Sequence, residues 1–195
     1  MSTPPLTVAQ FVTENNEANC WIAACAVTRQ AMMVDAPASD PRLFRYLEAR
    51  GLQLSGVFIT HAHYDHTDGL EMLLSTRSVP VYAAASLPGL AGTVNVKTEH
   101  EISLGALTGR VVETPGHTPD SISLVLPGVV FTGDALFAGS VGGTAGDRDR
   151  QREITSVREH ILSLPEDWLV CPGHGPSSTV GVEWRFNPFF NPPRK

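Results

Sequence analysis

The feature that most constrains this chain is a dense run of histidine and aspartate that directly follows a short apolar segment. Residues Gly56–Thr60 read GVFIT, which predicts a buried strand, and the next six residues contain His61, His63, Asp65 and His66. Imidazole and carboxylate groups are ligands of first-row divalent metals. Residues spaced by two share one side of an extended segment, so His61 and His63 can point to one place, whereas Asp65 and His66 follow where the chain turns. The run therefore favours two metal ions over one closed tetrahedral site.

Three further candidate ligands stand directly after other predicted strands. His117 lies in Thr114–Thr118 (TPGHT), and His174 lies in Cys171–Gly175 (CPGHG). Each Pro-Gly pair predicts a turn that brings a side chain sharply off a strand end. Asp134 follows an apolar strand, and its two oxygens suit it to bridge two metal ions about 3.5–4 Å apart. A lone histidine in a turn is more often a surface or capping residue, but the combination with the first run favours a shared metal site.

The hydrophobic patterning predicts short strands with a few helices on exposed faces. Asp40 predicts the N-cap of one helix, a second helix is expected from about Thr67, and a third over Asp149–Leu164, ended by Pro165. Apolar runs on either side of Pro127–Gly128 predict an antiparallel hairpin. This pattern is typical of an α/β fold with mixed sheets. The length of 195 residues fits one domain over residues 1–195.

Charge and hydropathy argue against several classes of partner. The chain has 14 basic and 20 acidic residues, a net charge of −6 and no block of lysine or arginine, so we expect no nucleic-acid partner. The longest apolar run, Cys20–Val27, has eight residues, which is too short to cross a membrane. Residues Met1–Gln10 have neither a basic segment nor an apolar signal core, and three cysteines imply no disulfide framework. Both features favour a cytoplasmic location.

The order of these motifs resembles that of the metallo-β-lactamase superfamily over nearly the whole chain. Within it, the sequence is most similar to the glyoxalase II-like hydrolases of the short, single-domain type, through Thr132–Phe137 (TGDALF) and Pro172–Pro176 (PGHGP). The resemblance implies an αββα sandwich, in which two mixed β-sheets are flanked by helices and the metals lie at the sheet edge. One departure is Gly143, which stands where an arginine is common in the family.

The resemblance also implies a binuclear site and a role for each ligand. Three residues would hold each ion, with Asp134 between them: His61, His63 and His117 for the first, and Asp65, His66 and His174 for the second. It implies a metal-dependent hydrolase in which a metal-bridged hydroxide cleaves an acyl thioester such as S-lactoylglutathione, with Asp65 and Asp134 as catalytic residues. Two zinc ions are expected, with iron or manganese as alternatives. We expect Tyr64 and Phe137 to line the mouth for this small-molecule substrate, and the protein to be a monomer or a homodimer.

Three other interpretations stay open. A persulfide dioxygenase would use one iron on His61, His117 and Asp134, the two-histidine, one-carboxylate set of non-haem iron enzymes. A lactonase or a β-lactamase-like hydrolase is another enzymatic alternative. A binding module with structural metal is disfavoured, because structural zinc sites are closed and favour cysteine, whereas this set consists of histidine and aspartate.

Overall fold

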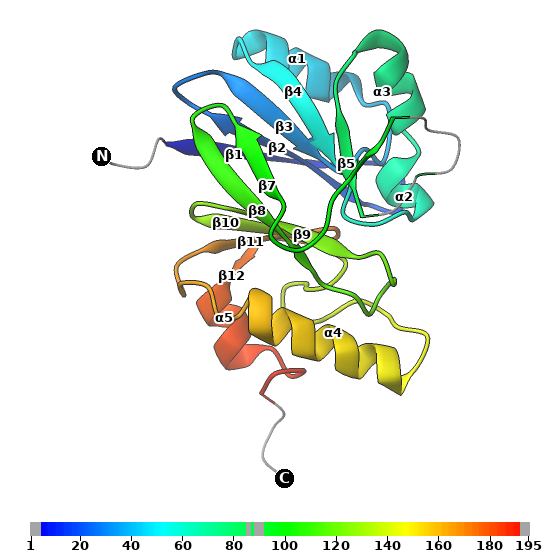
Figure 1. The fold of residues 1–195 in the computed structure, drawn as a ribbon, viewed down its shortest axis with the longest axis vertical. Coiled ribbons are helices and arrows are strands. Elements are labelled where there is room, and N and C mark those ends of the chain that lie inside the picture. Colours follow the sequence, from blue (N-terminus) through cyan, green and yellow to red (C-terminus); the bar gives the residue numbers. More distant parts are fainter. Residues whose placement is uncertain (1–4, 85–86, 88–91, 192–195) are drawn as a thin grey trace.

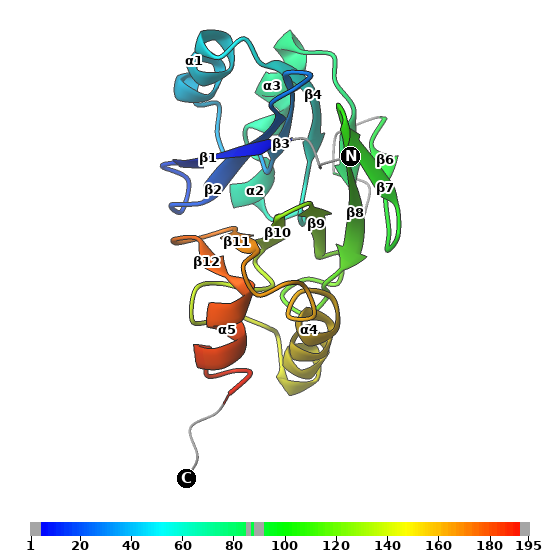
Figure 2. The same cartoon turned by 90° about the vertical axis from the view of Figure 1, so that its left-hand side faces the viewer.

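The computed structural model describes residues 5–84, 87 and 92–191, and within them two six-stranded sheets pack face to face (Figure 1, Figure 2). The first sheet has the order β1-β2-β3-β4-β5-β6. Its strands are β1 (Leu6–Val12), β2 (Asn19–Cys25), β3 (Gln30–Val34), β4 (Gln53–Phe58), β5 (Val81–Ala83) and β6 (Val94–Asn95). β1 to β3 are antiparallel neighbours, whereas β3 to β6 run parallel. The carboxyl ends of β3 and β4 therefore lie at the same edge.

The second sheet has the order β12-β11-β10-β9-β8-β7. Its strands are β7 (Glu101–Leu104), β8 (Leu107–Glu113), β9 (Ile122–Leu126), β10 (Val129–Gly133), β11 (Leu169–Pro172) and β12 (Ser178–Thr179). β9 and β10 are antiparallel, which confirms the hairpin predicted around Pro127–Gly128. β8 is also antiparallel to β9, and β11 is parallel to β10. The carboxyl ends of β8, β10 and β11 therefore share one edge of this sheet.

The described residues form five helices, four of which cover the outer faces of the sheets. They are α1 (Pro41–Ala49), α2 (Tyr64–Thr67), α3 (Leu70–Thr76), α4 (Asp147–His160) and α5 (Val180–Phe186). α1 and α3 pack on the first sheet through Leu43 and Leu70, and α4 and α5 pack on the second through Val157 and Val180 (Figure 2). The αββα sandwich predicted from the sequence is thereby confirmed. In this described part of the chain, no helix is long and apolar enough to cross a membrane.

The core between the sheets is apolar and takes side chains from both layers. Trp21 of β2 meets Phe131 of β10 edge-to-face, with ring centroids 6.2 Å apart, and Phe58 of β4 is fully buried in the same cluster. Burying one such side chain contributes about 1.5–3 kcal/mol. The Nε1 of Trp21 donates to the Pro172 carbonyl over 2.9 Å, so the core also fixes the strand end that leads to His174.

The helix predicted from about Thr67 is wrong in its start, because α2 begins earlier and α3 follows as a separate helix. The amide of Gly69 donates to the Ala36 carbonyl over 2.8 Å instead of continuing α2, so the chain breaks between the two helices. As a consequence, Asp65 and His66 lie on a helical turn and not in the extended segment that precedes it.

α4 begins two residues before the predicted Asp149–Leu164 helix and ends four residues before its end. The amides of Ile161 and Leu162 both donate to the Val157 carbonyl over 2.9 Å, which closes the helix with a tight turn. This turn buries both side chains against the second sheet. The prediction that Pro165 ends the helix was therefore wrong, since Pro165 only follows an end made by these two amides.

Candidate metal centre

The predicted ligands meet where strand ends of the two sheets face each other. His117, Asp134 and His174 follow β8, β10 and β11, whose carboxyl ends share an edge. The run from His61 to His66 follows β4 of the first sheet. Groups of histidine and aspartate from both sheets lie close enough to hold metal ions, and all seven predicted ligands belong to them.

We call His61, His63 and His117 the first trio. The Nδ1 of His63 lies 3.1 Å from Nε2 of His61 and 3.0 Å from Nε2 of His117. A histidine nitrogen lies about 2.0–2.1 Å from the zinc that it ligates, so nitrogens this close together can share one ion. Two of the three rings come from the segment after β4, and the third comes from the second sheet.

We call Asp65, His66 and His174 the second trio. The Nε2 of His174 lies 3.6 Å from Oδ2 of Asp65, and one donor atom of each residue lies within 4.8 Å of the others. His66 and Asp65 are buried, whereas His174 is partly exposed. The trio again combines two residues that follow β4 with one from the second sheet.

Asp134 lies between the two trios. Its Oδ1 is 3.4 Å from Nε2 of His66, and its Oδ2 is 3.5 Å from Nε2 of His117 and 3.6 Å from Nε2 of His174. One carboxylate therefore faces ligands of both trios. This is the arrangement expected of a group that bridges two ions.

Two buried polar atoms at the centre have no hydrogen-bond partner among the described residues. They are Nε2 of His66 and Oδ1 of Asp134, which face each other. A buried polar group without a partner costs about 1–3 kcal/mol. A ring nitrogen and a carboxylate oxygen can both coordinate a cation, so the donor set fits divalent metal ions.

The ring of His66 is held by Asp35, a residue that the sequence analysis missed. The Oδ2 of Asp35 accepts from Nδ1 of His66 over 2.8 Å and from the Thr60 hydroxyl over 2.9 Å. Because Nδ1 donates this bond, Nε2 of the neutral ring presents its lone pair to the site. The available signal was a carboxylate directly after the apolar strand β3, which is the same kind of signal that identified Asp134.

The backbone around Gly143 orients His117 in a similar way. The Nδ1 of His117 donates to the Gly143 carbonyl over 2.7 Å, which leaves Nε2 for the first trio. A Cβ added at Gly143 would meet nothing within 4 Å, so the contact depends on the carbonyl and not on the lack of a side chain. The glycine that replaces the expected arginine therefore still supports His117.

Burial and nearby charges shift the pKa values of the ligands in different directions. Burial opposes a charge on His66, but Asp35, Asp134 and Asp65 outweigh it and raise the pKa of His66 to about 9. Burial, followed by the neighbouring rings, lowers the pKa of His61 far below its ordinary value. Since neutral imidazole is the form that binds metal, His61 is ready to do so at neutral pH. His66 must first release a proton.

Both Pro-Gly-His turns need glycine because other groups approach them closely. A Cβ at Gly173 would lie 2.1 Å from Oδ1 of Asp134 and 2.7 Å from Cε1 of His66. A Cβ at Gly116 would lie 2.2 Å from Cβ of Glu153. The glycines therefore let each turn pack closely against its neighbours.

Glu153 of α4 lies beneath the His117 turn and was also missed. It is fully buried, and its Oε1 accepts from the backbone amide of His117 over 3.0 Å. Its Oε2 has no hydrogen-bond partner in the described part of the chain. Burial raises the pKa of Glu153 to about 8, and the charge of Asp134 adds to this effect. A signal was present, since Glu153 precedes the buried Val157 by four residues and so shares its helix face.

The two predicted substrate contacts lie beside the second trio. Phe137 meets the ring of His174 edge-on, with centroids 6.1 Å apart. Tyr64 is 61% exposed, and its hydroxyl accepts from the Asn16 amide over 2.6 Å. Both aromatic side chains therefore border the site, and their contact with substrate stays a prediction.

Comparison with known proteins gives two family models that divide the chain. The model described as Anti-Pycsar protein Apyc1 matches residues 7–87, and the model of the Metallo-beta-lactamase superfamily matches residues 91–174. The hydroxyacylglutathione hydrolase GloC of Haemophilus influenzae is 32% identical over 187 residues, which covers 84% of this chain and 88% of that protein. The chain belongs to the metallo-β-lactamase superfamily. This confirms the resemblance on which the ligand assignment was based.

Other members of the superfamily are similar over different lengths. A hydroxyacylglutathione hydrolase of Alkalilimnicola ehrlichii is 38% identical over 156 residues, so the alignment covers 79% of this chain but 60% of that longer relative. The structure of ETHE1 from Myxococcus xanthus has a TM-score of 0.84 at 30% identity and covers 93% of this chain and 83% of its own. TTHA1623 in a di-iron-bound form has a TM-score of 0.78 at 25% identity, with 93% and 99% covered. The relatives named hydroxyacylglutathione hydrolase support the predicted metallo-hydrolase, and the two structures support the fold.

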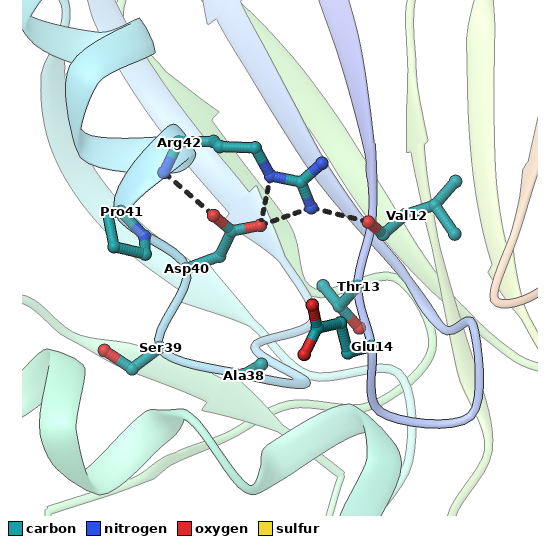
Figure 3. Close-up of a pocket in the computed structure, with 8 residues that line it drawn as sticks. All are labelled: Val12, Thr13, Glu14, Ala38, Ser39, Asp40, Pro41 and Arg42. Atoms are coloured by element: carbon teal, nitrogen blue, oxygen red, sulfur yellow. Dashed lines mark hydrogen bonds and ion pairs between the residues drawn. The ribbon is translucent and has the colours of Figure 1, made fainter.

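A separate pocket of about 360 Å³ lies between the end of β1 and the start of α1, and none of the eight residues that line it is a predicted ligand (Figure 3). Arg42 crosses it and donates to the Asp40 carboxylate and to the Val12 carbonyl, each over 2.7 Å (Figure 3). The guanidinium of Arg42, which could attract an anionic ligand, is thus already hydrogen-bonded within the protein. We assign this pocket to the attachment of α1 to β1, and not to the metal centre of the superfamily.

Proposed function

We propose that this member of the metallo-β-lactamase superfamily is a hydrolase of acyl thioesters that works with two divalent ions, zinc being the first choice. The observation that carries the proposal is the position of Asp134 between two trios of ligands. The first trio suits zinc because imidazole is a common zinc ligand. The carboxylate of the second trio also suits iron or manganese. The relatives named hydroxyacylglutathione hydrolase support the thioester class.

The chain's own residues supply the remaining requirements of the reaction. When bound, divalent ions lower the pKa of water to about 7 and polarise a carbonyl oxygen. The first trio would hold one ion and the second trio the other, while Asp134 would contact both and fix their separation. A thiolate leaves without help from a strong acid, because a free thiol has a pKa of about 8.5. A thioester therefore needs no additional acid from the chain, whereas an amine leaving group would need one.

We propose a small thioester such as S-lactoylglutathione as the substrate, with two aromatic side chains as its contacts. Phe137 packs on His174, and Tyr64 stands exposed beside Asp65. Two aromatic surfaces on the side of the second trio could contact the substrate, and ions held by the two trios would polarise its carbonyl. We propose these two residues as the substrate contacts.

The test is metal content together with thioester hydrolysis, measured under anaerobic conditions on protein purified without chelators. Two zinc ions per chain with turnover of S-lactoylglutathione is the expected result. His61→Ala and Asp134→Ala should each abolish turnover, because each removes a ligand of the centre. Full activity of both variants towards every tested ester and thioester would overturn the catalytic assignment.

A second candidate is a mononuclear-iron persulfide dioxygenase. The favouring observation is that His61, His117 and Asp134 lie together as two histidines and one carboxylate, with Nε2 of His117 3.5 Å from Oδ2 of Asp134 and the two rings 5.0 Å apart. The similarity to the ETHE1 structure keeps this candidate open. One iron per chain with oxygen uptake on glutathione persulfide, and no thioester turnover, would establish it in place of the hydrolase.

A further inference from the structure

The tip of the β1–β2 hairpin is a strained turn that points at the metal centre. The amide of Ala18 donates to the Asn15 carbonyl over 2.9 Å and closes a four-residue turn. Its two central residues, Asn16 and Glu17, have φ values of 50° and 55°. This is the pattern of a type I′ turn, in which asparagine is well tolerated but glutamate is not. A strained turn kept beside a functional site points to a role for the side chain that the turn presents.

The hairpin is attached to its surroundings on both sides of this tip. The Asn15 side chain donates to the Pro37 carbonyl over 2.9 Å, and Arg42 donates to the carbonyl of Val12 at the end of β1 (Figure 3). On the other side, the amide of Asn19 donates to the Gly173 carbonyl over 2.7 Å. These contacts link the turn to both sheets, so its tip is held at a defined place.

From this place the side-chain amide of Asn16 reaches two residues of α2. Its Nδ2 lies 2.6 Å from the Tyr64 hydroxyl and 3.1 Å from Oδ2 of Asp65. The two hydrogens of one amide nitrogen can serve both oxygens. The Oδ2 of Asp65 is also the atom that lies 3.6 Å from Nε2 of His174. Asn16 therefore contacts the same carboxylate oxygen of Asp65 that faces His174, another member of the second trio.

We infer that Asn16 is a positioning residue for the second ion. By donating to Asp65, it fixes the rotamer of a ligand that otherwise stands at the edge of the site. Carboxylates that bind metal commonly accept such an outer hydrogen bond, and its loss typically lowers metal affinity about 10–100-fold. Among the described residues, the Asn16 side chain donates to Tyr64 and Asp65, and of these only Asp65 is a candidate ligand, so we expect the effect to be confined to the second ion. The inference rests on the proposed two-ion centre but not on the substrate.

The variant that isolates this contact is Asn16→Gly. Glycine adopts a positive φ without strain, so the turn is kept while the amide is removed. The matched control is Glu17→Gly, which makes the same change one residue along, relieves strain and keeps the Asn16 amide. Both positions are exposed, and both variants should fold. A Glu17→Gly protein with an unfolding temperature at or above that of the wild type verifies that the turn tolerates glycine.

Metal-free wild type and both variants are titrated with Co²⁺, following the absorption of the bound ion, and bound metal is counted after equilibrium dialysis. In Asn16→Gly, the affinity for the second ion should fall about 10–100-fold while that for the first is unchanged. Glu17→Gly should match the wild type. Unchanged second-ion affinity in Asn16→Gly, or an equal fall for both ions, would overturn the inference. No substrate is present, so a failure of the proposed thioesterase activity would appear separately.

Discussion

Asp35 and His66, both buried at the base of the metal centre, share a hydrogen bond of 2.8 Å between Oδ2 and Nδ1. The carboxylate both orients the ring and favours its protonation in the metal-free protein, where the pKa of His66 is raised to about 9. A proton and a metal ion therefore compete for Nε2 of the same ring.

This competition predicts that the affinity for the second ion depends on pH. Below pH 9 the second ion must displace the proton of His66, so its apparent affinity should rise about tenfold per pH unit from pH 7 to 9. The stabilisation that protonated His66 gives the metal-free fold is present below about pH 6.5 and is lost as pH rises through about 9. Calorimetric titration in buffers of different ionisation enthalpy counts the released proton. Asp35→Asn should weaken the pH dependence, and an unchanged profile would contradict this account.

Substitution of Gly173 should disrupt the centre. A Cβ there would lie 2.1 Å from Oδ1 of Asp134, so Gly173→Ala must move the ligand turn or the bridging carboxylate. We expect a loss of the second ion and a destabilisation of about 1–3 kcal/mol, as for other overpacked sites. Metal content and denaturant unfolding measure both effects. Gly143→Ala is the control, since its Cβ would meet nothing within 4 Å, and metal loss in both variants would argue against the steric explanation.

Glu153 should make the metal-free protein less stable as pH rises. Its pKa is raised to about 8 by burial, whereas an unfolded glutamate ionises near pH 4.5, so the folded state holds a proton that the unfolded state has lost. The unfolding free energy should therefore fall between about pH 4.5 and 8. Glu153→Gln keeps an oxygen for the His117 amide and cannot ionise, so its advantage over the wild type should grow from pH 5 to 8 in chelator-treated protein. Parallel pH profiles would show that this carboxyl does not titrate in the range.

Asp40 should stabilise α1 mainly as its N-cap. Its Oδ1 accepts from the amide of Arg42 over 2.8 Å, and Asp40→Ala should cost about 1 kcal/mol in the free energy of unfolding. Asp40→Asn keeps the cap and tests the ion pair with Arg42, whose exposed contact should contribute little. The hydrogen bond from Arg42 lowers the pKa of Asp40, so its electrostatic contribution is present above pH 4 and is lost as pH falls through the folded pKa. Thermal unfolding of both variants at pH 7 and pH 3 separates the two effects.

The grouping of the seven candidate ligands could be predicted because their signals are local. His61 and His63 stand beside each other in the sequence, and the Pro-Gly turns before His117 and His174 are visible without a fold. The strand pattern predicted an α/β fold with mixed sheets, and the resemblance implied the sandwich. The sequence did not predict which side chains outside the two trios hydrogen-bond to the candidate ligands.

Asp35, Asn16 and Glu153 were missed because their partners lie on other elements. Asp35 precedes His66 by 31 residues. Glu153 accepts a hydrogen bond from the amide of His117, which lies 36 residues earlier in the chain. Each carboxylate had a weak local signal, its place after β3 or on the buried face of α4, but that signal alone does not tell a supporting carboxylate from a cap or a solvated charge. The turn at Asn16 was also hidden, since it lacks the glycine that usually marks a type I′ turn. The break between α2 and α3 has the same origin, because the Gly69 amide bonds to Ala36 of a distant segment.

Each trio combines two donors that follow β4 with one from the second sheet, so neither layer contains a complete trio. Metal binding by either trio would therefore depend on how the two layers are positioned against each other. A shift of one sheet relative to the other would separate the donors of both trios at once. Bound metal would thus report the relative position of the two layers.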